Sequence, residues 1–181
     1  MNSYKDITAK SDAPPLQGAI GVSVHGLLEL TKPRLSLMSV FTASLGFLVH
    51  FPLIHNFYIF FSLTIGTALA AGGAAALNQW MERDEDSLMP RTAKRPIPAH
   101  LIEPEFALVF GVCLSSLGLA ILWIGTNPWA CSLTLLTLVV YLLVYTPLKK
   151  RSPYATEIGA ISGALPPLIG WVAASGGPTL Y

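Results

Sequence analysis

Five long apolar runs, separated by shorter polar segments, dominate the pattern of hydrophobic and polar residues along the chain. They cover about residues 35–54, 57–77, 106–125, 128–145 and 158–174. Each run approaches the roughly 20 residues that a helix needs to cross a hydrocarbon core of about 30 Å. The runs are rich in Ala, Gly and Leu and lack the period-2 alternation of strands. Because a helix satisfies its own backbone polar groups in lipid, the pattern predicts an all-α, polytopic transmembrane bundle of about five spans.

Composition supports a membrane protein and excludes several other classes. Of the 181 residues, 52% are hydrophobic and only 12% are charged, whereas soluble domains carry roughly 25% charged residues. The formal net charge of +1 provides no field for a polyanion. These values exclude a disordered chain, a nucleic-acid-binding protein and a typical cytosolic enzyme.

The positions of the basic residues predict the orientation of the bundle. All 11 Lys and Arg residues lie before the first run, between the second and third, or between the fourth and fifth. The turns around His55 and Asn127 carry none. Since positively charged loops stay on the cytoplasmic side, we expect the N-terminus and both charged loops to be cytoplasmic.

The first 30 residues do not have the pattern of a signal peptide. They open with a polar stretch rather than with a basic start followed by an apolar core. Residues 1–30 are therefore expected to form a polar N-terminal tail. Within it, residues 16–30 fit either a short interfacial helix that leads into the first span or a flexible tail, and both interpretations stay open.

A charged segment after the second run contains the residues that point to chemistry. Asn78, Glu82 and Asp86 are spaced i, i+4, i+8. On a continuing helix they share one face, about 6 Å apart per step, and Asp84 points to the opposite side. Hard cations such as Mg²⁺ bind carboxylate oxygens and often share them with substrate phosphates. Glu82 and Asp86 are therefore candidate metal ligands.

Three cations follow this acidic segment within five residues, namely Arg91, Lys94 and Arg95. Guanidinium and ammonium groups suit phosphate oxygens. Carboxylates for a metal beside cations for a phosphate match what the departure of a diphosphate requires. The alternative is a cytoplasmic loop of mixed charge without chemistry, which is common in membrane proteins.

The same stretch resembles a known family. Asn78-x-x-x-Glu82-x-x-x-Asp86, followed by Met89-x-Arg91-Thr92-x-x-Arg95-Pro96, is similar to the first acidic motif of the UbiA superfamily of intramembrane prenyltransferases. Within the superfamily the likeness is greatest to the protoheme IX farnesyltransferases. Residues 30–34, 145–150 and 163–171 carry that likeness. The resemblance extends from about Leu30 to Ser175, with Ala155 and Glu157 as departures from the usual pattern.

The resemblance implies transfer of a farnesyl group from farnesyl diphosphate to a vinyl group of haem b, giving haem O. It implies Mg²⁺ held by the acidic motif, apolar walls around the developing cation, and aromatic faces that stabilise it. The implied site residues are Asn78, Glu82 and Asp86 for catalysis and metal, Arg91, Lys94 and Arg95 for the diphosphate, Lys149 and Lys150 for haem propionates, and Trp80 or Tyr145 for the cation. For both lysines, a role only in membrane topology is the alternative.

The resemblance also concerns the length of the chain. The family's bundle continues with further helices and a second acidic motif, whereas the acids from residue 103 onward are Glu103, Glu105 and Glu157, none at DxxxD spacing. We therefore expect residues 31–181 to be the N-terminal part of such a membrane domain. We also expect the 181-residue chain to insert into a membrane without making haem O unaided.

Two other functions remain as alternatives. One is prenylation of an aromatic acceptor or quinone precursor, and the other is a non-catalytic membrane protein. A transporter or channel is disfavoured because none of the five runs contains Lys, Arg, Asp or Glu, apart from Glu157 at an edge. The expected location is the inner membrane of a bacterial cell, with the mitochondrial inner membrane as the alternative.

The predicted orientation can be tested by cysteine labelling. Cysteines placed at Asn56 and at Ser152 should react with a membrane-impermeant maleimide from opposite sides of the membrane, because the two positions lie in an uncharged and a basic turn. The unmodified chain, with Cys113 and Cys131, supplies the background. Equal reactivity of both positions from the cytoplasm would contradict the five-span arrangement.

Overall fold

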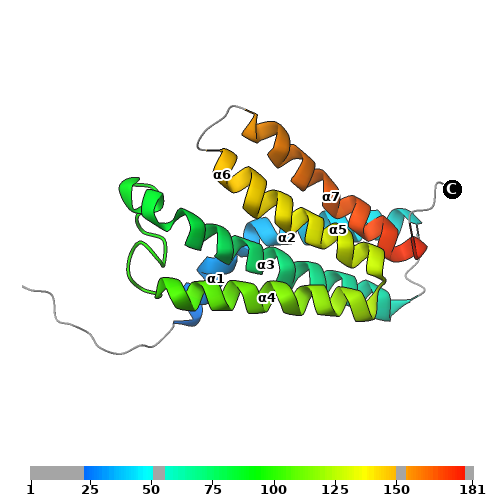
Figure 1. The fold of residues 1–181 in the computed structure, drawn as a ribbon. Helices are drawn as coiled ribbons and strands as arrows, with labels where there is room; N and C mark the ends of the chain where they lie inside the picture. The colour runs from blue at the N-terminus through cyan, green and yellow to red at the C-terminus, as the bar shows by residue number, and fades with distance from the viewer. Residues whose placement is uncertain (1–22, 51–55, 150–153, 178–181) are drawn as a thin grey trace, which may run out of the picture.

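The computed structural model describes residues 23–50, 56–149 and 154–177, and this part of the chain is helical without strands. The elements, in chain order, are α1 (Val24–Thr31), α2 (Pro33–His50), α3 (Phe57–Leu88), α4 (Pro104–Gly125), α5 (Pro128–Val139), the π-helical turn η1 (Val140–Tyr145), α6 (Thr146–Leu148) and α7 (Ala155–Ser175). Figure 1 shows the long helices side by side, with α3 between α4 and the α5–α6 helix. The predicted all-α membrane bundle is confirmed.

Four of the described helices are long and apolar enough to cross a membrane. They are α3, α4, the continuous helix Pro128–Leu148, and α7. The helix α2 packs against α7 and α3, but polar residues at its ends, Arg34 and His50, lower its hydropathy and it is not among the four. The last part of the first predicted run lies outside the described residues, so a fifth span stays a prediction.

The helix α3 is longer than the apolar run that predicted it. The run ends near Leu77, whereas α3 continues to Leu88 and is followed by Pro90. A proline disfavours helical conformation in the residue before it, which explains why the helix ends there. Thirty-two residues give a length of about 48 Å, more than the hydrocarbon core needs. The acidic motif therefore lies on an extension of the helix past the apolar run.

Glycines allow α3 and α4 to approach closely. A Cβ atom added to Gly73 would lie 2.6 Å from the Ser115 nitrogen, and one added to Gly118 would lie 2.6 Å from the Ala70 nitrogen. Without a hydrophobic driving force between helices in lipid, such close backbone packing is a main source of helix association. Close approach at these glycines therefore joins α3 to α4.

The helices α2 and α7 also touch through glycines. A Cβ on Gly170 would lie 1.8 Å from the Ala43 oxygen, and a Cβ on Gly46 would lie 1.9 Å from the Pro167 oxygen. Beside this contact, Phe47 and Leu63 form part of a buried apolar cluster. These contacts hold α7 across α2 and leave a space between α2, α3, α5 and α7.

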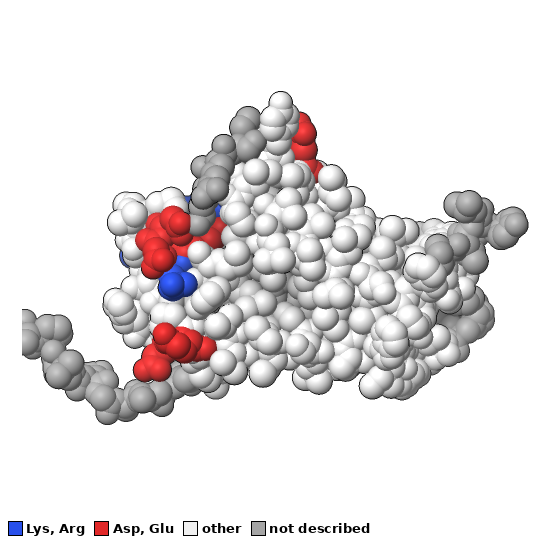
Figure 2. Space-filling model, in the orientation of Figure 1, with Lys and Arg blue, Asp and Glu red and all other residues white. Residues whose placement is uncertain are grey.

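The charged side chains visible in one view gather at one end of the bundle. Figure 2 shows Lys, Arg, Asp and Glu mostly at the end where the loop after α3 lies, and none on the visible atoms of the opposite end. At the charged end, Leu30 of α1 packs with Ala76 of α3 and with Ile97 and Ile102 of the loop. This small core fixes α1 and the loop beside the polar extension of α3.

The close packing of α3 on α4 gives a stability prediction. Gly118→Ala should lower the free energy of unfolding by about 1–3 kcal/mol, because the added methyl group meets backbone atoms that cannot move away easily. The matched control is Gly163→Ala, where a Cβ meets nothing within 4 Å, and where the change should raise the free energy by up to about 1 kcal/mol. Unfolding in mixed micelles measures both. Equal values would contradict the packing.

Candidate active site

The polar end of α3 buries one face. Asn78, Glu82 and Asp86 are 3%, 4% and 2% exposed, whereas the Asp84 side chain is 83% exposed. The i, i+4, i+8 spacing places the three buried residues in one row because α3 remains helical through Asp86. Two carboxylates therefore lie in a low-dielectric environment, where each requires a positive partner.

Cations from two other parts of the chain pair with the buried carboxylates. Arg95 donates a hydrogen bond from Nη1 to Asp86 Oδ2, and the same nitrogen lies 3.9 Å from Glu82 Oε2. Lys149, at the end of α6, places its Nζ 2.5 Å from Glu82 Oε1. Each carboxylate is thus neutralised by a side chain from outside α3: Asp86 by Arg95 of the loop that follows the helix, and Glu82 by Lys149, far away in the sequence.

The loop after α3 turns back on the helix that carries the carboxylates. Thr92 is buried and donates a hydrogen bond from Oγ1 to the main-chain oxygen of Asp86, 3.0 Å away. This bond brings Arg95 to the acidic face. Arg91 and Lys94 are exposed. Of the three predicted diphosphate cations, Arg95 is the one in contact with the carboxylates, and the roles of Arg91 and Lys94 stay predictions.

A third cation reaches the acidic face from the N-terminal side, and sequence reasoning did not assign it to the site. Lys32 donates from Nζ to Asn78 Oδ1 at 3.3 Å. Burial is the main cause that lowers the pKa of Lys32 from 10.5 to about 8, and the positive charge of Arg95 is the second. Lys32 and Asn78 are 46 residues apart, and no spacing rule links positions so distant. The one signal in the sequence was the place of Lys32 within the segment 30–34.

The π-helical turn η1, with Thr146 directly after it, lies beside Asn78 at the polar end of α3. Thr146 donates from Oγ1 to the Tyr141 oxygen, 2.9 Å away, and receives a bond of 3.2 Å from the Asn78 amide. The rings of Tyr141 and Tyr145 stack with their centroids 5.6 Å apart. Because a π turn holds an extra residue, Thr146 bonds to the main-chain oxygen of the residue five positions before it, and such turns are frequent at functional sites.

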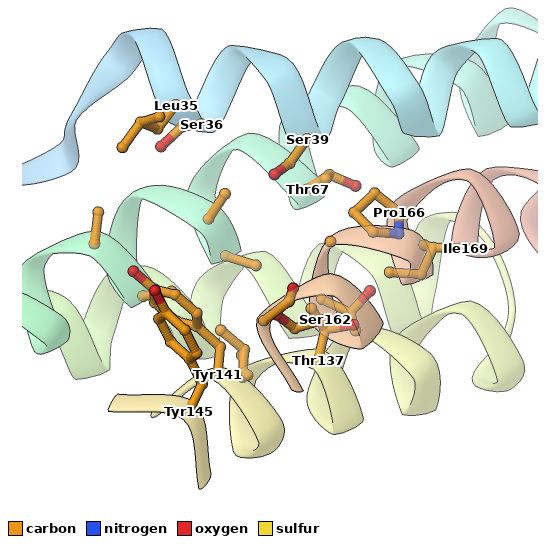
Figure 3. Close-up of a pocket in the computed structure, with 18 of the residues that line it drawn as sticks. Leu35, Ser36, Ser39, Thr67, Thr137, Tyr141, Tyr145, Ser162, Pro166 and Ile169 are labelled. Carbon is orange, nitrogen blue, oxygen red and sulfur yellow. The ribbon is translucent and has the colours of Figure 1, made fainter. Parts of the chain in front are cut away.

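A cavity of about 490 Å³ extends from this polar end into the bundle. Lys32, Tyr141 and Tyr145 are among the residues that line it, and alanines of α3 form part of its wall. Figure 3 shows Tyr141 and Tyr145 toward one end of the cavity, with Thr67, Pro166 and Ile169 toward the other. The lining of the cavity is mostly apolar, and Lys32 is its charged residue. The cavity therefore suits a ligand with a hydrocarbon chain and a charged group that lies near Lys32.

The other aromatic candidate lies elsewhere. Trp80 packs against the cluster around Leu30, and the Arg83 guanidinium lies 5.1 Å from the centroid of its ring. Trp80 does not line the cavity, whereas Tyr145 does. Of the two aromatic residues proposed to stabilise a cation, the structure therefore places Tyr145 where it can contact a ligand.

The donors at the acidic face fit a magnesium ion that shares its ligands with a phosphate. They are two carboxylates and one amide oxygen, on Glu82, Asp86 and Asn78. Within the described ranges no group of three or more His, Cys, Asp and Glu residues could hold a metal alone. Since Mg²⁺ is commonly bound by one or two carboxylates together with substrate phosphates, this donor set fits it.

Comparisons with known proteins find a prenyltransferase family and relatives named for one activity within it. The model of the UbiA prenyltransferase family matches residues 39–180. The chain is 50% identical over 149 residues to a protoheme IX farnesyltransferase of Opitutus terrae, covering 82% of this chain and 50% of that protein. It is 42% identical over 161 residues to the protoheme IX farnesyltransferase of Solibacter usitatus, covering 84% of this chain and 55% of that protein.

A solved structure gives the same fold. It comes from a study of digeranylgeranylglyceryl phosphate synthase in membranes, with a TM-score of 0.75 and 19% sequence identity. The match covers 82% of this chain and 52% of that one. The chain spans about half the length of the curated relatives it matches.

The buried ion pairs give a prediction about stability. Arg95→Leu should lower the free energy of unfolding by about 3 kcal/mol, because it leaves Asp86 buried without its cation. Lys94→Leu is the matched control: Lys94 is exposed, so the change should stay within about 0.5 kcal/mol. Chemical unfolding in mixed micelles measures both variants. Similar losses for the two would show that Arg95 does not neutralise a buried carboxylate.

Proposed function

Because the chain belongs to the UbiA prenyltransferase family, we propose that it carries the diphosphate-binding half of a protoheme IX farnesyltransferase. The reaction transfers a farnesyl group from farnesyl diphosphate to a vinyl group of haem b and gives haem O. Relatives with that name at 40–50% identity support this choice. The observation that carries the proposal is a buried acidic face, ringed by cations, at the polar end of an apolar cavity.

The diphosphate would lie at the polar end of the cavity, near Lys32, Arg95 and Lys149. These three cations come from three separate parts of the chain and meet at one row of α3. Asn78, Glu82 and Asp86 would hold Mg²⁺, which when bound neutralises charge on the diphosphate. With a diphosphate present, Arg95 and Lys149 can exchange a carboxylate for a phosphate oxygen without losing an ionic partner.

The cavity serves the reaction by excluding water. When the allylic carbon–oxygen bond breaks, its electron pair leaves with the diphosphate and positive charge develops on the farnesyl group. Apolar walls such as Ala71 and Leu138 keep water from that carbon, and the stacked rings of Tyr141 and Tyr145 offer faces to the cation. The vinyl group then bonds to the farnesyl carbon, and water adds to the resulting cation with loss of a proton.

The position of Lys149 favours a role at the diphosphate over one at a haem propionate. Its ammonium group lies on Glu82, on the side of the acidic motif. Lys150 lies outside the described residues, and its contact with a propionate stays a prediction. As a multi-pass protein with bacterial relatives, the chain is proposed to lie in the inner membrane of a bacterial cell.

Prenylation of an aromatic or quinone precursor is the rival activity. It uses the same diphosphate chemistry, so the acidic face alone does not distinguish the two acceptors. The identity to relatives named for protoheme IX favours haem b. The acceptor must therefore be tested directly.

A chimera tests the proposal. This chain replaces the matching 149 residues of the Opitutus terrae relative, and the chimera is expressed in cells without their own haem O synthase. Extracted haem analysed by mass should contain haem O. A chimera that inserts and prenylates only an aromatic acceptor would contradict the proposed substrate.

Substitutions in the same chimera test the site. Glu82→Gln and Asp86→Asn should reduce haem O by at least about 100-fold, because each removes a buried negative charge at the proposed metal site. Asp84→Asn is the matched control and should have little effect, since Asp84 is exposed on the other side of α3. A loss with Asp84→Asn equal to that with Asp86→Asn would refute the assignment of the acidic face.

A further inference from the structure

The short helix α1 ends against α3, and hydrogen bonds satisfy the carbonyl groups of its last turn. The last four carbonyl groups of a helix have no partner within it and need donors from elsewhere. Here all four have donors. Thr31 Oγ1 donates to the Leu28 oxygen at 3.0 Å, and the Lys32 N–H donates to the Glu29 oxygen at 3.3 Å. Gln79 Nε2 donates to the Glu29 and Leu30 oxygens at 3.1 and 3.0 Å, and Ser36 Oγ donates to the Thr31 oxygen at 2.7 Å. The end of α1 is therefore held in one place.

Gln79 supplies the part of this set that comes from α3. The residue is 1% exposed, and its amide nitrogen donates hydrogen bonds to two carbonyl oxygens of α1. It follows Asn78 in the chain, so the two side chains are about 100° apart around the helix. Asn78 faces Lys32 and Thr146, while Gln79 faces the end of α1. Consecutive residues of α3 thus bind the N-terminal segment at two points.

Between these two points lies a residue in a rare backbone conformation. Lys32 has φ 44° and ψ 63°, in the left-handed region, and the next residue is Pro33. Residues other than glycine occupy this region at an energetic cost, and such conformations persist where the surrounding structure determines them and cluster at functional sites. Here the hydrogen bonds from Gln79 and Ser36 to the last carbonyl groups of α1 hold the backbone on the N-terminal side of Lys32. In this conformation, Lys32 Nζ contacts Asn78 and lines the cavity.

We propose that Gln79 is a positioning residue: it fixes the end of α1 so that Lys32 stays at the mouth of the cavity and binds the anionic group of the substrate. The proposal rests on the proposed function in taking that group to be a diphosphate. Gln79 itself acts through Lys32, because its amide is occupied by α1 and is buried. The N-terminal helix thereby becomes part of the substrate site.

A double-mutant cycle on the 181-residue chain tests the proposal. The chain is purified in detergent, and pyrophosphate is titrated by calorimetry in the presence of Mg²⁺. Lys32→Met should weaken binding about tenfold or more, as expected for the loss of a charge-assisted hydrogen bond. Gln79→Met, similar in size but without donors, should also weaken binding. The double variant should bind no more weakly than Lys32→Met alone, because Gln79 then has nothing left to position.

The control variant is Ile102→Val. Ile102 packs against Gly26 of α1 and belongs to the same buried cluster as Leu30, but it donates no hydrogen bond to α1. It should leave pyrophosphate affinity unchanged, which separates loss of the amide from a general loosening of α1. If Gln79→Met does not fold, Ser36→Ala replaces it in the cycle, since Ser36 bonds to the Thr31 oxygen in the same segment.

Each remaining outcome has a defined meaning. Wild-type affinity in Gln79→Met, or losses that add up in the double variant, would overturn the positioning role while leaving the proposed function intact. Failure of the unmodified chain to bind pyrophosphate with Mg²⁺ would instead contradict the diphosphate site, and with it the ligand assigned to Lys32. Masking of the Gln79 effect by Lys32→Met supports both the positioning role of Gln79 and the diphosphate site.

Discussion

Two carboxylates buried side by side on α3 require positive charge close to them, and much of the structure at this end of the bundle supplies it. Glu82 and Asp86 are almost inaccessible, so neither can rely on water for its solvation. Arg95 arrives through a loop tied to α3 by Thr92, and Lys149 arrives at the end of a helix that passes through a π turn. Because each of these segments is anchored by its own polar contacts, removal of one anchor is expected to disturb the charge balance of the whole face.

The apolar part of the bundle places this charged face beside a cavity. Glycines bring α3 against α4 and α2 against α7, and the space that remains between α2, α3, α5 and α7 is lined mostly by apolar groups. A substrate with a charged head and a hydrocarbon tail matches that arrangement, since its two ends have opposite requirements. Lys32, the charged residue of the cavity lining, joins the two environments, because its ammonium group also donates a hydrogen bond to Asn78 on the acidic face.

The sequence predicts some of these features well and others not at all. Apolar runs predict the helices, and the i, i+4, i+8 spacing predicts the common face of Asn78, Glu82 and Asp86, because both depend on residues near one another in the chain. The cations were less predictable: three neighbouring candidates fit equally, and the folded loop brings Arg95 to the carboxylates. The contacts of Lys32 and Lys149 with this face, and the π turn beside them, depend on packing between distant segments. Residue types and spacing in the sequence do not predict that packing.

We propose that the buried face of α3 binds a metal–diphosphate pair. The most direct measurement replaces Mg²⁺ with Mn²⁺ and records the pulsed electron paramagnetic resonance spectrum of the chain in the presence of pyrophosphate. A hyperfine coupling to ³¹P should appear, and it should be lost with Glu82→Gln or Asp86→Asn but retained with Asp84→Asn. Protein-bound Mn²⁺ without ³¹P coupling, or a coupling that survives both substitutions of the buried carboxylates, would contradict a metal–diphosphate site on this face of α3.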